Sequence, residues 1–138
     1  MRELKVRAWY KPYKQMCQVE SLRFDGNGVY TAVLIEEPFY DRRIVEADEI
    51  VIEQFTNLKD KNGTEIYEGD IIVQKSLGSN KSGCRGKITY KEDHAAFMFE
   101  VYERGKPVMW LFLSEFNPEK TCEVIGNIHE NPEFLEEK

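Results

Sequence analysis

A stretch near the middle of the chain, residues 58–73 with the sequence LKDKNGTEIYEGDIIV, contains two turn signals in close succession. The first is Asn62-Gly63, the strongest short hairpin signal because both residues tolerate positive φ. The second is Gly69-Asp70, which stands directly before a β-branched run. We expect each turn to reverse the chain, so the stretch forms a tight double bend that joins an N-terminal half to a C-terminal half.

The side chains of this bend divide into an apolar and a charged set. Apolar side chains of a turn-rich segment plug inward, whereas charged ones stay in water. We therefore expect an inward set of Leu58, Ile66 and Tyr67. The set expected to face water is Lys59, Asp60, Lys61 and Glu65.

Alternating apolar and polar residues predict short strands on both sides of the bend. These strands cover residues 4–10, 16–24, 29–36, 50–56, 71–73, 87–90, 95–102, 108–113 and 122–129. The pattern leaves residues 46–49 open between a helical turn and a loop. Gly126 inside the last strand indicates a bulge or a close backbone approach. Asn131-Pro132 followed by acidic residues predicts a short C-terminal helix with Asn131 as its N-cap.

Short strands separated by Gly-rich turns predict an all-β, mainly antiparallel fold, either a sandwich or a small barrel. The order of strands after Gly69-Asp70 is similar to that of SH3-like small barrels, a likeness of fold alone. With 138 residues the chain can bury roughly two-thirds of its unfolded surface. We therefore expect one compact domain over residues 1–138, in which an N-terminal β segment (1–57) packs on a barrel-like segment (58–138).

Residues 56–71, with the sequence TNLKDKNGTEIYEGDI, resemble the signature of the YopX family. Residues 2–9 (RELKVRAW) and 123–133 (EVIGNIHENPE) extend the resemblance toward both ends of the chain. Asn57 stands where that family usually carries Gly, and Asn is the next most tolerant residue of left-handed backbone. The family comprises small phage and prophage proteins of uncertain function. The resemblance thus implies a fold and a phage context in a bacterial host, and it supplies no catalytic residues.

The charge and the cysteines exclude several classes of protein. A formal net charge of −6 argues against a general polyanion binder. Three separated cysteines without a CxxC pair are expected to be free thiols in a reducing cytoplasm: Cys17, Cys84 and Cys122. The charged, alternating N-terminus predicts no signal peptide, and no window is apolar enough for a membrane span.

Residues 78–83 have the glycine spacing of a phosphate-binding loop, but Cys84 and Arg85 replace the Lys and Ser or Thr that such a loop needs. We therefore predict no nucleotide site. A group of cations remains on what we predict to be a loop: Lys75, Lys81, Arg85 and Lys87. Two interpretations stay open, a contact for an anion or nucleic acid and a solvated hairpin loop.

No catalytic or metal site is predicted. His94 and His129 are the only histidines, and neither stands at ligand spacing from a cysteine or from the other histidine. The carboxylates have no accompanying nucleophile, and Ser114 lacks a GxSxG setting. We expect a protein without a cofactor and without enzymatic activity.

Aromatic and apolar residues suggest binding instead. Four aromatic side chains are candidates for an exposed platform, with burial in the core as the alternative: Trp9, Tyr10, Trp110 and Phe112. The run at residues 108–113 is more apolar than one half-buried strand requires, which favours a homo-oligomer. We therefore expect a binding module whose partner is a second copy or a host or phage protein, and nucleic acid is the less favoured partner.

Overall fold

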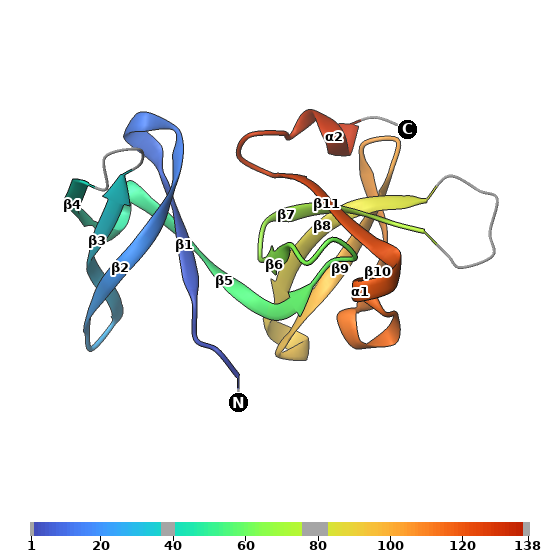
Figure 1. Ribbon diagram of the computed structural model, residues 1–138, viewed down its shortest axis with the longest axis horizontal. Coiled ribbons are helices and arrows are strands. Elements are labelled where there is room, and N and C mark those ends of the chain that lie inside the picture. Colours follow the sequence, from blue (N-terminus) through green and yellow to red (C-terminus); the bar gives the residue numbers. More distant parts are fainter. Residues whose placement is uncertain (1, 37–40, 76–82, 137–138) are drawn as a thin grey trace. The chain divides into compact units, whose positions relative to one another are not determined.

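The computed structural model describes residues 2–36, 41–75 and 83–136 (Figure 1). Its described elements are mostly antiparallel strands, which confirms the predicted all-β class. The chain divides into two compact units. The N-terminal unit is Leu4–Gln54, and the C-terminal unit is Phe55–Lys138 with the first residues Met1–Glu3. That both units form one compact domain stays a prediction.

In the N-terminal unit, antiparallel strands lie in the order β4-β3-β2-β1-β5. Their bounds are β1 Val6–Tyr10, β2 Gln15–Asp25, β3 Gly28–Glu36, β4 Asp41–Glu46 and β5 Ile50–Lys59. The last of these continues into the C-terminal unit. A short 3-10 turn at Ala47–Glu49 settles the open choice at residues 46–49. The core of the unit consists of Ala8, Tyr10, Cys17, Ala32, Leu34, Val45 and Ile50.

In the C-terminal unit, a five-stranded antiparallel sheet has the order β10-β9-β8-β7-β11 (Figure 1). The strands are β6 Glu65–Tyr67, which pairs with β5, and β7 Asp70–Gln74, β8 Cys84–Lys91, β9 Ala96–Glu103, β10 Lys106–Phe112 and β11 Cys122–Asn127. The core contains Ile66, Ile72, Ile88, Phe99, Val101, Leu113 and Cys122. Over the described residues β10 and β11 are the two edges of the sheet, so closure into an SH3-like barrel, and packing of the N-terminal strands on it, stay predictions.

Helical segments of the C-terminal unit are short. They are 3-10 turns at Glu92–His94 and Leu113–Glu115, and helices α1 Pro118–Thr121 and α2 Glu133–Glu136. Helix α2 confirms the predicted C-terminal helix. The side chain of Asn131, the expected N-cap, points back to β11, where its Oδ1 accepts a hydrogen bond from the amide of Asn127 (3.2 Å). Within the described ranges no helix has the length and the apolar character needed to cross a bilayer.

Gly126 lies at the irregularity where β11 shifts its register against β7, which confirms the predicted bulge. A Cβ atom at this position would meet Asn131 Oδ1 at 2.3 Å. The glycine therefore leaves the room that the Asn131 side chain needs to reach the backbone of β11.

Both turns of the double bend are present, and the chain reversal at the first lets β6, a strand that was not predicted, pair antiparallel with β5. The first turn differs in detail. The Gly63 amide donates to the Asp60 carbonyl oxygen (3.0 Å), so Lys61 and Asn62 are the central residues and Gly63 follows them with φ of 81°. Of the Asn62-Gly63 pair only the glycine has positive φ.

Asp60 is also placed differently from the expectation, because its side chain is buried instead of facing water. Its Oδ1 accepts hydrogen bonds from the amides of Asn62 and Thr64, both at 2.9 Å. Its Oδ2 accepts one from the amide of Val124 on β11, also at 2.9 Å. The carboxylate therefore holds the turn closed and ties it to the edge of the sheet.

The second turn agrees with the prediction. Gly69 is buried with φ of 86°, and its backbone is bonded on both sides. Its amide donates to the Ile88 carbonyl (2.8 Å), and its carbonyl accepts from the Ile128 amide (2.9 Å). The buried Asp70 accepts a hydrogen bond from the Tyr67 amide at Oδ2 (2.7 Å). These contacts leave Gly69 no freedom to change its conformation.

Gly69→Val is expected to lower the free energy of unfolding by roughly 1 to 3 kcal/mol, because a β-branched residue is strained at this φ. Gly26→Val is the matched control, since Gly26 has no positive φ and open space where a Cβ would stand. Lys61→Ala, at an exposed position, should also be close to neutral. Urea denaturation measures all three, and equal midpoints for Gly69→Val and the parent protein would contradict the prediction.

Candidate functional site

Strand β10 carries three exposed large apolar side chains of the C-terminal unit, and Tyr90 of β8 is another that the structure describes there. Val108 is 54% exposed, Met109 50% and Trp110 40%. The first half of the run that the sequence singled out, residues 108–110, is therefore exposed, whereas Leu111 and Phe112 are partly buried and Leu113 lies in the core. We call Val108, Met109 and Trp110, together with Lys91, the β10 surface.

The β10 surface is presented by a tight hairpin. Arg104 and Gly105 connect β9 to β10 with φ of 54° and 78°, the positive values that suit the twist of a two-residue hairpin loop. A shift of register between Pro107 and Met109 then places a bulge in β10. Because the bulge adds a residue to one strand, it bends β10 and re-aims the side chains beside it.

Trp110 is held in place by a neighbour two strands away. The Nζ atom of Lys91, at the end of β8, lies 3.8 Å from the centroid of the Trp110 ring. A cation over an exposed aromatic face contributes about 0.5 to 1 kcal/mol. Beyond Trp110, the Phe112 ring lies 5.7 Å from the ring of His94. His94 also bonds Asp93 (3.0 Å), and this hydrogen bond holds the pKa of the Asp93 carboxyl below its ordinary value.

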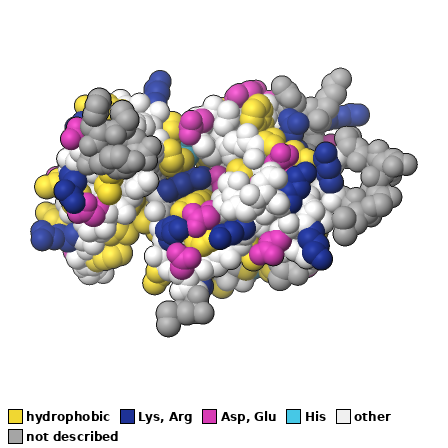
Figure 2. All heavy atoms as spheres, viewed as in Figure 1, with side chains coloured by type: hydrophobic (Ala, Val, Ile, Leu, Met, Phe, Trp, Pro, Cys, Tyr) yellow, Lys and Arg dark blue, Asp and Glu magenta, His cyan; other side chains and the backbone are white. Residues whose placement is uncertain are grey.

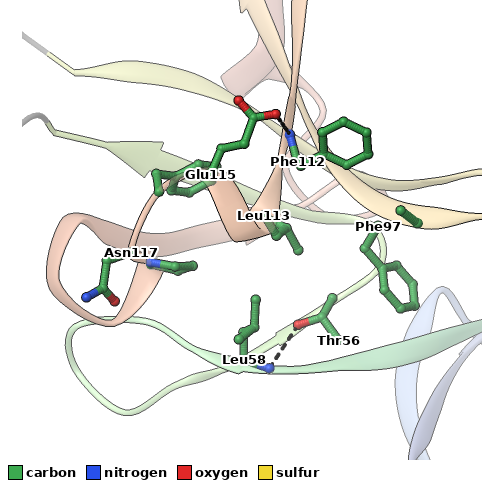
Figure 3. A pocket seen from close by; sticks show the side chains of 10 residues that line it. Thr56, Leu58, Phe97, Phe112, Leu113, Glu115 and Asn117 are labelled. Carbon is green, nitrogen blue, oxygen red and sulfur yellow. Dashed lines mark hydrogen bonds between the residues drawn. The ribbon is translucent and has the colours of Figure 1, made fainter. Parts of the chain in front are cut away.

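As the edge of its sheet, β10 is protected against the addition of another strand. Pro107 has no amide hydrogen. The amide of Phe112 donates to Glu115 Oε1 at 3.2 Å (Figure 3). A bulge interrupts the strand between Pro107 and Phe112. Proline and bulges are common means of blocking edge pairing in natural sheets. The β10 surface is thus suited to contacts through side chains.

The opposite edge of the sheet, β11, is covered from within the unit. The Lys61 amide donates to the Cys122 carbonyl (3.0 Å), and the Val124 amide donates to Asp60 (2.9 Å). Burial is the main cause that raises the pKa of the Cys122 thiol to about 11, and the Asp60 carboxylate adds to it. The first turn of the double bend therefore covers this edge.

A groove of about 730 Å³ adjoins the end of β10 (Figure 3). Figure 3 shows Leu58, Phe97 and Leu113 directed toward the same space. The hydroxyl of Thr56 donates to the Ile66 carbonyl (2.7 Å) and accepts from the Leu58 amide (3.2 Å). The lining is Thr56, Leu58, Ala96, Phe97, Phe112, Leu113, Glu115, Phe116, Asn117 and Pro118. The groove suits an apolar group, since the side chains of Thr56 and Glu115 are already hydrogen-bonded to nearby backbone groups.

The predicted cations are distributed among acids and aromatic rings. Arg85 lies in β8 and not on a loop, and its Nη1 donates to the Phe134 carbonyl of α2 (3.2 Å). Lys87, also in β8, has its Nζ 3.9 Å from Oε1 of the buried Glu100. Lys75 is exposed at the end of β7. Lys81 lies outside the described residues.

Acidic side chains accompany these cations. Lys75 and Arg85 line a hollow of about 690 Å³ together with Glu103 and Glu123. The face in Figure 2 likewise shows Lys and Arg side chains interspersed with Asp and Glu. Burial, with a hydrogen bond to Glu100, raises the pKa of Tyr102, another residue of this hollow, to about 12. The hollow is therefore mixed in charge.

The remaining sequence candidates lie elsewhere. Trp9 belongs to β1 of the N-terminal unit and is half-buried, whereas Tyr10 is in the core, as the alternative interpretation held. Cys17 and Cys122 are buried and Cys84 is exposed. In the ranges that the structure describes, no three His, Cys, Asp or Glu side chains gather in a way that could hold a metal ion.

Sequence reasoning missed three residues that shape the site, namely Lys91, Glu115 and Asp60. Glu115 carried a detectable local signal, because an acid three residues after Phe112 can reach back to that backbone amide. The contact of Lys91 with Trp110 depends on the register of three strands and has no local signal.

Comparison with known proteins adds to this description. The family model described as "YopX protein" matches residues 5–136. Among solved structures, the chain is similar to "Crystal structure of protein EF1440 from Enterococcus faecalis", with 29% identity and a TM-score of 0.65 over 98% of this chain and 99% of that one. No curated protein matches the sequence. Since the family model spans nearly the whole chain, which confirms the resemblance predicted from residues 2–9, 56–71 and 123–133, the chain belongs to the YopX family.

Proposed function

We propose that this chain is a phage- or prophage-encoded binding module without catalytic activity, which acts in the cytoplasm of the bacterial host by binding another protein chain through its β10 surface. The observation that carries the proposal is the exposure of Val108, Met109 and Trp110 on an edge strand. Clustered apolar side chains on a folded surface mark interaction sites more often than scattered ones do.

The chemistry of the surface supports a protein as its partner. Trp and Met are enriched at the centre of protein interfaces, where a few buried side chains supply most of the binding energy. The contact with Lys91 restricts the Trp110 ring before binding, which reduces the entropy lost on association. The apolar groove next to Phe112 offers room for a further side chain of the partner.

Nucleic acid is the less favoured partner because the described cations of the predicted group, Lys75, Arg85 and Lys87, lie beside acids or are bonded. Arg85 bonds α2, Lys87 lies beside Glu100, and Lys75 shares its hollow with two glutamates. Non-specific affinity for nucleic acid needs many cations free to contact phosphates. The proposal of a non-catalytic role rests on the absence of a nucleophile motif from the sequence and on the structural hydrogen bonds of Thr56 and Glu115 at the groove.

The proposal predicts that Met109→Glu lowers capture of protein partners by at least about tenfold, because a charge would be buried at the centre of the contact. Tagged parent and variant are used as baits in lysogenic or infected cells, with and without nuclease. Ile44→Glu is the control, since Ile44 is 77% exposed but lies in the N-terminal unit. Capture that nuclease abolishes, or that Met109→Glu leaves unchanged, would contradict the proposal.

A further inference from the structure

The geometry of β10 points to a second copy of this chain as the partner, docked antiparallel to the first about a two-fold axis that crosses β10. This inference rests on the proposed binding role of the β10 surface and names its occupant. The reasons are the distribution of charge along the strand, the position of its exposed apolar residues and the protection of its backbone.

Opposite charges stand at the two ends of β10. Arg104 and Lys106 lie at its start, and the carboxylate of Glu115 is fixed at its end by the hydrogen bond from the Phe112 amide. Glu103 is the cross-strand neighbour of Lys106, and the backbone of Glu136 in α2 lies beside Gly105 of the same hairpin. Near the other end Asp93 is bonded to His94, and Lys91 lies over Trp110.

A two-fold axis makes this distribution self-complementary. In an antiparallel pair the start of one strand lies beside the end of the other, so Lys106 of each copy would face Glu115 of the other. A parallel arrangement would instead place like charges together. Because the two-fold axis relates the two copies, the contact between Lys106 and Glu115 occurs twice.

An exposed aromatic residue stands where such an axis would pass. Trp110 lies next to the midpoint between Lys106 and Glu115 in the chain, so it would pack near its own counterpart. Its exposed surface would then be buried at the centre of the contact, with the charged pairs at its rim. This is the usual anatomy of a specific interface.

The protected backbone determines the kind of contact. Pro107 offers no amide hydrogen, the Phe112 amide is bonded to Glu115, and a bulge separates them. These features disfavour a continuous sheet across the two copies. The two β10 strands would therefore meet through side chains. The net charge of −6 opposes indiscriminate aggregation while permitting this one contact.

Charge reversal tests the inference by sedimentation velocity at micromolar concentration and moderate salt. The parent is expected to sediment as a dimer, with twice the mass of 16.2 kDa. Lys106→Glu and Glu115→Lys should each weaken dimerisation by about tenfold or more, since each places like charges together. The double variant K106E/E115K should restore the dimer.

The restoration is specific to a contact between copies. Lys106 and Glu115 lie at opposite ends of β10 within one chain, so exchanging their charges repairs nothing inside a monomer. Loss of the bond from the Phe112 amide in Glu115→Lys would likewise persist in the double variant. Thermal melting by circular dichroism confirms that each variant is folded.

A single monomeric mass that persists on concentration would overturn the inference, and so would a dimer that neither reversal weakens or that the double variant fails to restore. The capture experiment distinguishes failure of this inference from failure of the proposed binding function. Suppose that the parent is monomeric, but that it still captures a protein in a way that resists nuclease and depends on Met109. The β10 surface then binds a different protein. If capture is also absent, both proposals are wrong.

Discussion

Asp60→Ala is expected to lower the free energy of unfolding by about 3 to 5 kcal/mol, because it leaves three backbone amides without the buried carboxylate that accepts their hydrogen bonds. Asn62, Thr64 and Val124 all donate to this carboxylate, and the residue is only 3% exposed. Each amide that loses its partner in a buried site costs about 1 to 3 kcal/mol. Water that enters the vacated space would recover part of this loss, so the estimate is below the full sum.

Two neighbouring variants make the measurement specific. Asp60→Asn keeps an oxygen that can serve Asn62 and Thr64, but it directs an NH₂ group toward the Val124 amide, so its loss should be intermediate. Lys61→Ala changes an exposed side chain in the same turn and should be close to neutral. Urea denaturation gives the three values. A fall below about 1 kcal/mol for Asp60→Ala would mean that the carboxylate does not hold the turn to β11.

Asp60 also shows where sequence reasoning ends. Its bonds to Asn62 and Thr64 are local, and an acid two residues before Asn62 is a known means of closing a turn. Its bond to Val124 joins positions 64 residues apart. Nothing in the local sequence indicates that β11 would approach the turn and bury the charge, and so the side chain was expected in water.

Backbone conformation was predictable where a single residue decides it. Gly69 has the positive φ that the turn required, and Asn57 has φ of 71°, in agreement with its tolerance of left-handed backbone. Asn57 also bonds the backbone of Glu3 in both directions, at 2.8 and 3.0 Å. This second role depends on where the N-terminus lies, which the residues around Asn57 do not specify.

The candidate site was predicted only in part, for a similar reason. Composition identified the apolar run and Trp110, but whether a strand is central or at an edge follows from the order of all strands in the sheet. The predicted group of cations was also incomplete as a description. Lys75 and Arg85 line one hollow, but Arg85 bonds the Phe134 carbonyl of α2 and Lys87 lies beside Glu100 of β9. These partners lie on other elements, and the residues around the cations do not indicate them.

Gly86→Ala is the second change expected to have a large effect, a loss of about 3 kcal/mol or more in the free energy of unfolding. Gly86 is buried in β8, and a Cβ there would stand 2.0 Å from the Glu100 carbonyl oxygen and 2.7 Å from Cε1 of Phe99. The first of these atoms is backbone in the neighbouring strand, so it has no rotamer by which to move away. Either β8 and β9 separate or their pairing shifts.

The consequence should extend to the β10 surface, because β8 carries Lys91 and β9 pairs directly with β10. A shift between β8 and β9 would move the Lys91 ammonium relative to the Trp110 ring, which it now approaches to 3.8 Å. Gly26→Ala is the matched control, since nothing lies within 4 Å of the position of its added Cβ. Urea denaturation measures stability, and sedimentation of the variant under native conditions measures association. If Gly86→Ala unfolds at the same urea concentration as Gly26→Ala, the close approach of β9 to Gly86 does not exist in solution.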